Sequence, residues 1–150
     1  RRRFVTRADT LLGGLEGRVV AVLGLAFKEG TDDLRDSPAI SVIDMLEERG
    51  AAVRAHDPRA MTNASRILPH VTMTGNAYEA AAGADAIMLC TPWPEYRDLD
   101  LTRLRAAMRG SLLLDGRNLL DPAAAADAGF RYEGIGRAAP GAVRGSIVPR

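Results

Sequence analysis

Two cationic side chains stand directly after apolar segments, where a parallel sheet would expose them. Lys28, the only lysine among the 20 basic residues, follows an apolar run at 18–25, and Arg117 follows a second run at 111–115. Because parallel strands end at one edge of a sheet, we expect both cations to face one crevice. Two convergent cations suit a diphosphate or another anionic group. The alternative is that each is a solvated surface charge.

A third cation, Arg35, lies in an acidic loop with Asp32, Asp33 and Asp36. One interpretation is an ion-pair network confined to the loop. The other is a guanidinium that reaches out of the domain toward a second ligand. The residues alone leave both interpretations open.

The loop that holds Lys28 and Arg35 lacks the features of a phosphate cradle built from backbone amides. A dinucleotide fingerprint needs three glycines in the spacing G-x-G-x-x-G, and a P-loop needs a glycine-rich turn before Lys and Ser or Thr. Residues 24–38 read GLAFKEGTDDLRDSP and match neither pattern. Any phosphate bound here is therefore expected to be held by side-chain cations.

The other side chains capable of chemistry favour structural roles. Cys90 lies inside an apolar run, which favours a small buried core residue over a nucleophile. Asp57 has the place of a ribose-binding acid, but without the glycines a turn and helix cap is favoured. Trp93, between two prolines, could pack over the crevice or be structural. We identify no catalytic triad, no metal site and no catalytic pair of carboxylates.

The overall composition argues against several classes of partner. A formal net charge of +1 gives no reason to expect nucleic acid or an anionic membrane as the partner. No apolar run reaches about 18 residues, the length of a membrane span. One cysteine cannot form an internal disulfide, so we expect a reducing, cytoplasmic setting.

Apolar runs and helical periodicities alternate along the chain. Strands are expected at 18–25, 52–56, 71–74, 85–91, 111–115 and 130–135, and helices at 38–49, 77–82, 94–108 and 122–128. The first of these helices has Ser37 as its N-cap, Pro38 at its first position and Gly50 at its end. The alternation predicts an α/β fold, a Rossmann-like doubly wound and mainly parallel sheet with helices on both faces, in a single domain.

Several ordered motifs resemble the UDP-glucose/GDP-mannose dehydrogenase family, in its C-terminal UDP-binding domain. They are VAVLGLAFK at 20–28, TDDLRDSPA at 31–39, AHDP at 55–58, TPWPEY at 91–96, DGRN at 115–118 and GFxYxGIGR at 129–137. The resemblance covers about 10–137. It implies a UDP-sugar-binding domain at 16–137, a lead-in from an absent central region at 1–15 and a flexible tail at 138–150.

The resemblance also implies an activity and roles for individual residues. The family oxidises the C6 alcohol of a nucleotide sugar to a carboxylate with NAD as oxidant. Phe27, Lys28 and Arg117 would contact the UDP moiety, and Arg35 would reach the NAD site across a domain interface. The Asp-Gly-Arg-Asn form is more similar to members that use UDP-sugars, particularly UDP-glucose.

Parts of the family pattern have no counterpart in this sequence. The glycine-rich NAD-binding domain is missing, and Cys90 does not match the motif of the catalytic cysteine. We therefore expect no catalytic residue in this chain and no dehydrogenase activity from this chain alone. NAD would be bound mainly by the missing N-terminal domain of the parent enzyme. The parent is expected to be a homo-oligomer, whereas this chain alone could be a monomer. The alternatives are a stand-alone nucleotide-binding or regulatory module, a structural assembly domain, or the same domain of a UDP-N-acetylmannosamine or GDP-mannose dehydrogenase.

Overall fold

One parallel sheet organises the fold in the computed structural model, which describes residues 1–135. Within these residues the six strands lie in the order β3-β2-β1-β4-β5-β6, and every neighbouring pair is parallel. The strands are β1 (Val19–Leu23), β2 (Ala52–His56), β3 (Thr72–Met73), β4 (Ala86–Leu89), β5 (Leu112–Asp115) and β6 (Arg131–Gly134). The expected Rossmann-like, doubly wound α/β fold in a single domain is confirmed. The expectation for 138–150 lies outside the described residues.

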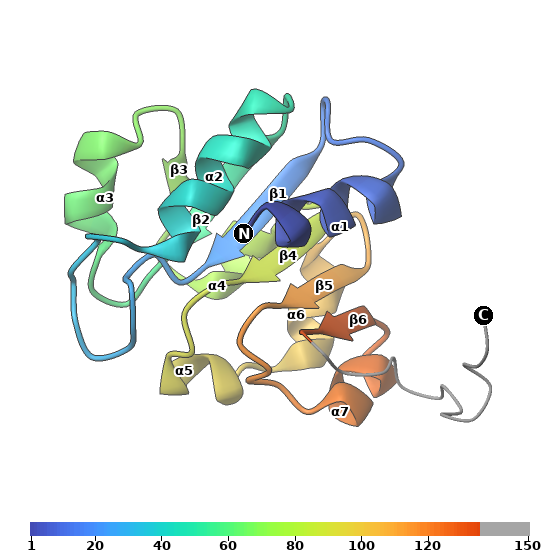
Figure 1. The fold of residues 1–150 in the computed structure, drawn as a ribbon. Helices are drawn as coiled ribbons and strands as arrows, with labels where there is room; N and C mark the ends of the chain where they lie inside the picture. The colour runs from blue at the N-terminus through green and yellow to red at the C-terminus, as the bar shows by residue number, and fades with distance from the viewer. Residues whose placement is uncertain (136–150) are drawn as a thin grey trace.

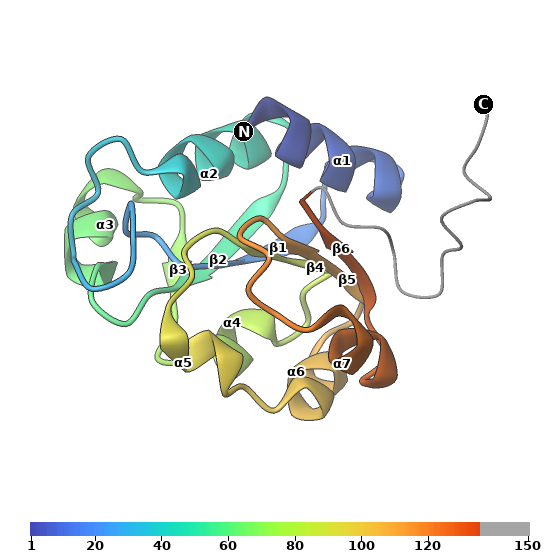
Figure 2. The same cartoon turned by 60° about the horizontal axis from the view of Figure 1, so that its bottom comes forward.

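Helices cover both faces of the sheet (Figures 1 and 2). One face carries α1 (Arg2–Leu12), α2 (Pro38–Glu48) and α3 (Met61–Ile67), and the other carries α4 (Ala77–Ala81), α5 (Pro94–Arg97), α6 (Leu101–Ala107) and α7 (Pro122–Asp127). Every residue of β4 and β5 is buried, which explains why these strands read as continuous apolar runs rather than alternating ones. None of the helices in this part of the chain has the length and apolar character needed to cross a bilayer.

The helix expected at 94–108 is two helices instead. α5 ends at Arg97, and α6 starts only at Leu101, after Asp100. The Asp100 carboxylate accepts a hydrogen bond from the backbone N–H of Arg103 at 3.1 Å, so it caps a new helix. Asp100 is the sequence signal for the start of a second helix, and the helical periodicity of 94–108 obscures it.

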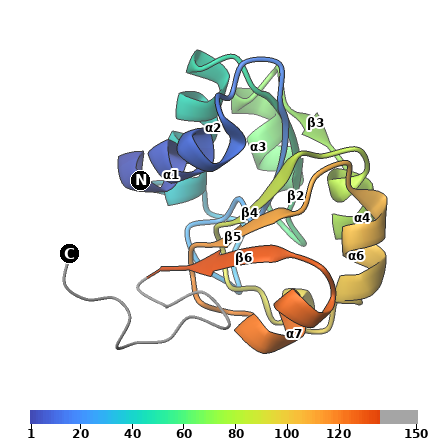
Figure 3. The same ribbon diagram turned by 90° about the vertical axis from the view of Figure 1, so that its right-hand side faces the viewer.

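The segment 1–15, expected as a lead-in, contains a helix that packs on this fold. Figure 3 shows α1 on the face of the sheet opposite α6 and α7. Val5 and Ala8 of α1 are fully buried, and Arg7 forms a two-pronged ion pair with Glu133 of β6, at 2.7 and 2.8 Å. Its arginines conceal this apolar stripe in the sequence. The short polar helix α3, with only Ala64 buried, was likewise not predicted.

Candidate functional site

A cavity opens at the carboxyl edge of the sheet, where the strand order reverses. From β1 the chain proceeds outward to β3, and from β4 it proceeds outward to β6. Ligands of open α/β sheets bind at such a switch point. The cavity has a volume of about 260 Å³. It is lined by the start of α1, the N-terminal part of α2 and the ends of β4, β5 and β6, namely Arg1, Phe4, Pro38, Val42, Leu89, Cys90, Gly116, Arg117 and Ile135.

The cavity combines an apolar wall with positive charge. Arg1 and Arg117 contribute guanidinium groups, and the N-terminus of α2 adds the positive end of its helix dipole beside Pro38. Phe4 approaches closely because residue 116 is a glycine: a Cβ there would meet a ring carbon of Phe4 at 3.1 Å and the Leu89 carbonyl oxygen at 2.9 Å. The arrangement suits an anionic small molecule with an apolar or aromatic part.

The thiol of Cys90 lies in the cavity wall but is not activated. Its side chain is buried, and burial raises the pKa of Cys90 to about 12, although the nearby Arg117 charge acts in the opposite direction. A thiol with this pKa is almost entirely protonated at neutral pH and is a poor nucleophile. The interpretation of Cys90 as a buried core residue is confirmed.

The loop that presents Arg117 is held by a fully buried carboxylate. Oδ1 of Asp115 accepts a hydrogen bond from the backbone N–H of Arg117 at 3.1 Å. Its Oδ2 accepts from the backbone N–H of Leu120 and from the hydroxyl of Tyr132, each at 2.8 Å. Asn118 then takes a left-handed conformation with φ of 52°, and its side-chain amide donates to the carbonyl of Ile135 at 2.7 Å. The Arg117 loop is thus bound to Tyr132 of β6 and to Ile135, the residue after that strand.

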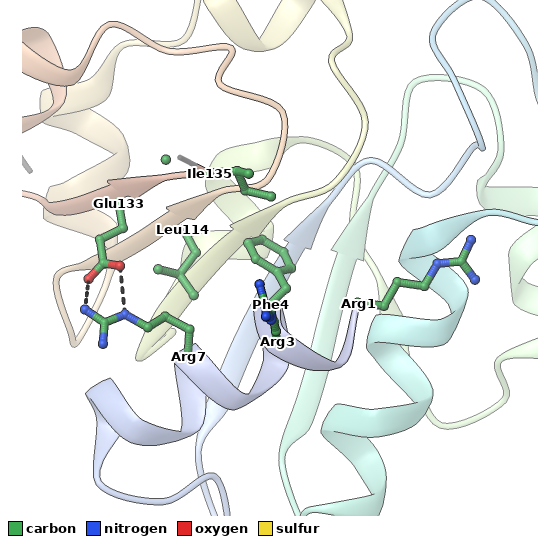
Figure 4. A pocket seen from close by; sticks show the side chains of 8 residues that line it. Arg1, Arg3, Phe4, Arg7, Leu114, Glu133 and Ile135 are labelled. Carbon is green, nitrogen blue, oxygen red and sulfur yellow. Dashed lines mark hydrogen bonds and ion pairs between the residues drawn. The ribbon is translucent and has the colours of Figure 1, made fainter. Parts of the chain in front are cut away.

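A second cavity adjoins the first between α1 and the β5–β6 edge. It has a volume of about 330 Å³ and shares Arg1, Phe4 and Ile135 with the first. Figure 4 shows Phe4 beside Ile135, and Arg7 paired with Glu133 at the far end. The start of α1 therefore contributes residues to both cavities.

Asp57 holds the loop after β1 through hydrogen bonds to its backbone, as Asp115 holds the loop after β5. This carboxylate is fully buried, and its Oδ2 accepts hydrogen bonds from the backbone N–H groups of Leu25 at 2.7 Å and Ala26 at 3.0 Å. The indole N–H of Trp93 donates to the same oxygen at 3.0 Å. Oδ1 caps the following turn by accepting from the N–H groups of Arg59 and Ala60. The turn expected at Asp57 is confirmed, but the expected helix cap is wrong, because the N-cap residue of α3 is Ala60, which has no side-chain capping hydrogen bond. Trp93 is structural.

The backbone of this loop has no amide left for a phosphate between residues 24 and 27. The N–H of Gly24 donates to the carbonyl of His56, and that of Phe27 donates to the carbonyl of Asp33. With Leu25 and Ala26 bound to Asp57, all four N–H groups have internal acceptors. The amides of residues 24–27 are therefore not available for the kind of cradle that dinucleotide-binding folds use.

The cations of the β1 loop lie at the protein surface, apart from Arg117. Phe27 is half-buried, Lys28 is exposed, and the Lys28 ammonium sits 5.3 Å from the centre of the Phe27 ring. Neither residue lines the cavity that Arg117 lines. The common carboxyl edge expected for Lys28 and Arg117 is present, but they do not line one cavity in this conformation.

Arg35 is engaged within its own loop. Its guanidinium donates to both carboxylate oxygens of Asp33 at 2.8–3.2 Å, while 89% of its side chain remains exposed. The hydrogen bond from Arg35 lowers the pKa of Asp33 to about 2. The ion pair expected within the loop is thus present, and most of the Arg35 side chain remains exposed.

Residues in the first turn of α1 were not foreseen as part of the site. Arg1 and Phe4 line the cavity, and the sequence signal that could have indicated this helix is the helical spacing of Phe4, Ala8 and Leu11.

Among residues 1–135, no three His, Cys, Asp or Glu side chains are grouped so that they could hold a metal ion.

Comparison with known proteins identifies the family. The family model described as "UDP-glucose/GDP-mannose dehydrogenase family, UDP binding domain" matches residues 21–122. The chain belongs to this family. The matched segment runs from β1 into α7 and contains Asp57 and Asp115 as well as Lys28 and Arg117. The family resemblance read from the motifs is therefore confirmed.

Individual relatives agree with this assignment. The UDP-glucose 6-dehydrogenase of Pseudomonas aeruginosa is 42% identical over 149 residues, which are 95% of this chain and 33% of that protein. The UDP-glucose 6-dehydrogenase of Rhizobium meliloti is 46% identical over 125 residues, 83% of this chain and 29% of that protein. The solved UDP-glucose dehydrogenase of Pyrobaculum islandicum has a TM-score of 0.78 at 39% identity, covering 91% of this chain and 29% of its own. The chain thus spans about a third of the length of these relatives.

Proposed function

We propose that this chain is the C-terminal UDP-binding domain of an NAD-dependent UDP-glucose 6-dehydrogenase, which oxidises UDP-glucose to UDP-glucuronate. The observation that carries the proposal is the cavity at the switch point, which Arg117 lines within the segment matched by the family's UDP binding domain. Relatives at 42% and 46% identity are both named UDP-glucose 6-dehydrogenases, which favours UDP-glucose over other nucleotide sugars.

Each site residue has a role in this proposal. Arg117 offers a planar guanidinium that can bind a diphosphate through two hydrogen bonds. Lys28 supplies a second cation on a flexible stem from the β1 loop, and Phe27 supplies a half-buried ring next to it. Since the amides of residues 24–27 have internal acceptors, side-chain cations bear the recognition of the anion.

The amides of residues 24–27 have internal acceptors, which supports assigning NAD to other parts of the parent enzyme. Arg35, exposed at the tip of its loop, is the residue we assign to contact NAD across the domain interface. The Cys90 thiol is protonated and buried, so it does not replace a catalytic cysteine. The chain alone is therefore expected to be inactive. The proposed parent enzyme is a cytoplasmic homo-oligomer.

Calorimetric titration of UDP, UDP-glucose and GDP-mannose into this chain at low salt tests the proposal. We expect UDP and UDP-glucose to bind, and Arg117→Ala and Lys28→Ala to weaken UDP binding by roughly 10- to 100-fold, the usual loss for a hydrogen-bonded charge. Arg66→Ala removes an exposed arginine of α3 and is the matched control, with unchanged affinity. A folded wild-type chain that binds neither uridine nucleotide would contradict the proposal.

The predicted lack of activity needs a separate assay. The purified chain is incubated with UDP-glucose and NAD, and NADH is followed by absorbance at the concentrations at which UDP binds. We expect no NADH above the rate without protein. Sustained NADH formation by this chain would overturn the assignment of the chemistry to other domains.

A further inference from the structure

We infer that Tyr132, on the edge strand β6, is a positioning residue that fixes Arg117 for nucleotide binding through the carboxylate of Asp115. Tyr132 itself is 3% exposed and does not line the cavity. The inference rests on the proposed function, because it concerns how the same site is held in its binding geometry.

A short chain of hydrogen bonds carries the inference. The Tyr132 hydroxyl donates to Oδ2 of Asp115 at 2.8 Å, and Oδ1 of the same carboxylate accepts from the backbone N–H of Arg117 at 3.1 Å. The hydroxyl also lies 3.4 Å from the carbonyl of Leu120, but a phenol has one proton and the shorter contact takes it. Asp115 is therefore the side chain that links the Tyr132 hydroxyl to the backbone of Arg117.

The geometry explains why the Asp115 carboxylate needs a fixed orientation. Its two oxygens act on opposite ends of the loop, with Oδ1 on the N–H of Arg117 and Oδ2 on the N–H of Leu120. Rotation of the carboxylate would break both contacts at once. Tyr132 approaches from the neighbouring strand, where it is paired in register with Leu113, two residues before Asp115. A rigid strand thus sets the plane of the carboxylate, and the carboxylate sets the loop.

A second contact fixes the other part of the loop. Asn118 has a φ of 52°, in the left-handed region that asparagine adopts more readily than most residues other than glycine. Its side chain donates to the carbonyl of Ile135, just beyond the end of β6. The two contacts run to β6 and to the residue that follows it, so loss of the Tyr132 hydrogen bond removes one of these supports from the Arg117 loop.

The test uses Tyr132→Phe, which removes the hydroxyl and keeps the buried ring. We expect UDP to bind about 3- to 10-fold more weakly, the range for one positioning hydrogen bond. Tyr78→Phe is the control: its hydroxyl accepts the backbone N–H of Asp100 at 2.9 Å, away from the cavity. This variant should keep its affinity within about two-fold of wild type, as expected for independent sites.

A double-mutant cycle separates positioning from general destabilisation. In the Arg117→Ala background, Tyr132→Phe should cause no further loss of UDP affinity beyond about two-fold, because its effect acts through Arg117. The same 3- to 10-fold loss in both backgrounds would overturn the inference, even if both variants fold.

A measurement without ligand keeps the inference testable if the proposed function fails. In Tyr132→Phe, hydrogen exchange at the amides of Arg117 and Leu120 should be at least about 3-fold faster, with no change in Tyr78→Phe. Wild-type protein that binds no UDP but shows this exchange pattern would contradict the proposed function and support the positioning role. Unchanged exchange at both amides would overturn the inference whatever the binding result.

Discussion

Two loops at the carboxyl edge of the sheet are each held by a buried aspartate, but the cations that they carry lie in different surroundings. The loop after β1 is held by buried Asp57, and the loop after β5 by buried Asp115. Each loop carries a cation: Lys28 lies in the loop after β1, and Arg117 lies in the loop after β5. Arg117 lines a cavity, whereas Lys28 stands at the surface beside Phe27.

The difference follows from what each carboxylate binds. Asp57 takes up the amides of the β1 loop that would otherwise face a phosphate, and it also binds Trp93. Asp115 instead binds the far ends of a short turn and leaves the Arg117 side chain at the cavity. Under the proposed function, the anion is therefore bound by side-chain cations rather than by the amides of residues 24–27.

The largest expected effect is on stability, and it separates the two carboxylates. Asp57→Ala leaves five N–H donors without their acceptor and should lower the free energy of unfolding by about 3–5 kcal/mol, whereas Asp115→Ala, with three donors, should cost about 2–3 kcal/mol. Both variants lose the same atoms, so urea unfolding compares the hydrogen bonds directly. A larger loss for Asp115→Ala would break the comparison.

Removing one donor from Asp57 should have a smaller effect. Trp93→Phe deletes the indole N–H bonded to Oδ2 and keeps an aromatic ring in a site that is 4% exposed. We expect the free energy of unfolding to fall by about 1–2 kcal/mol. The measurement is urea unfolding monitored by circular dichroism. The four backbone donors should keep the β1 loop in place, so a loss as large as that of Asp57→Ala would show that Trp93 carries more than this bond.

The reactivity of Cys90, which follows β4, tests the chemistry of the cavity that Arg117 lines. Its thiol has a pKa of about 12 against a usual value of 9.0, so the thiolate fraction at pH 8 falls by about a thousand-fold. A disulfide reagent should leave the native chain unmodified and label one thiol after unfolding in urea. Rapid labelling of the native protein would mean that Cys90 is accessible and activated by Arg117.

The smallest effect concerns the ion pair of the β1 loop. Arg35→Ala should raise the pKa of Asp33 from about 2 toward 3.8, measured by the pH dependence of its carboxyl signal in NMR spectra. Because the folded-state pKa is depressed, the stabilisation by this pair is present above about pH 4 and disappears as the pH falls toward 2.

The control for that titration is Arg59→Ala. The Arg59 guanidinium donates to the carbonyl of Gly30 in the same loop, at 3.1 Å, and does not contact Asp33. This variant should leave the Asp33 pKa where it is. An Asp33 pKa that stays near 2 without Arg35 would show that the loop backbone, rather than the guanidinium, holds the carboxylate ionised.

Much of the architecture could be predicted because its signals are local. The second strand has the predicted bounds, and Ser37 caps α2 as the Ser-Pro pair indicated. The helix α1 was missed because arginines interrupt its apolar stripe, and the break at Asp100 was hidden by continuous helical spacing. Local patterns thus determine the strands, while ends and short helices depend on tertiary packing.

The site was predictable in part for a related reason. Strand-end positions indicated Lys28 and Arg117, but the sequence could not show that Asp57 turns inward to the amides of Leu25 and Ala26. Nor could it show that Tyr132, seventeen residues from Asp115, closes the network around Arg117. Such contacts join distant segments, and spacing along the chain carries no record of them.

The central claim is that UDP binds at the carboxyl edge, between the Arg117 cavity and the Lys28 loop. Titration of UDP into the isotope-labelled chain, followed by amide chemical shifts in NMR spectra, tests this claim most directly. The account predicts the largest shifts at residues 26–28 and 116–118, with little change at the amino edge around Ser111 and Arg131. Shifts confined to the amino edge, or to the α1–α2 groove around Asp44 and Glu48, would contradict it.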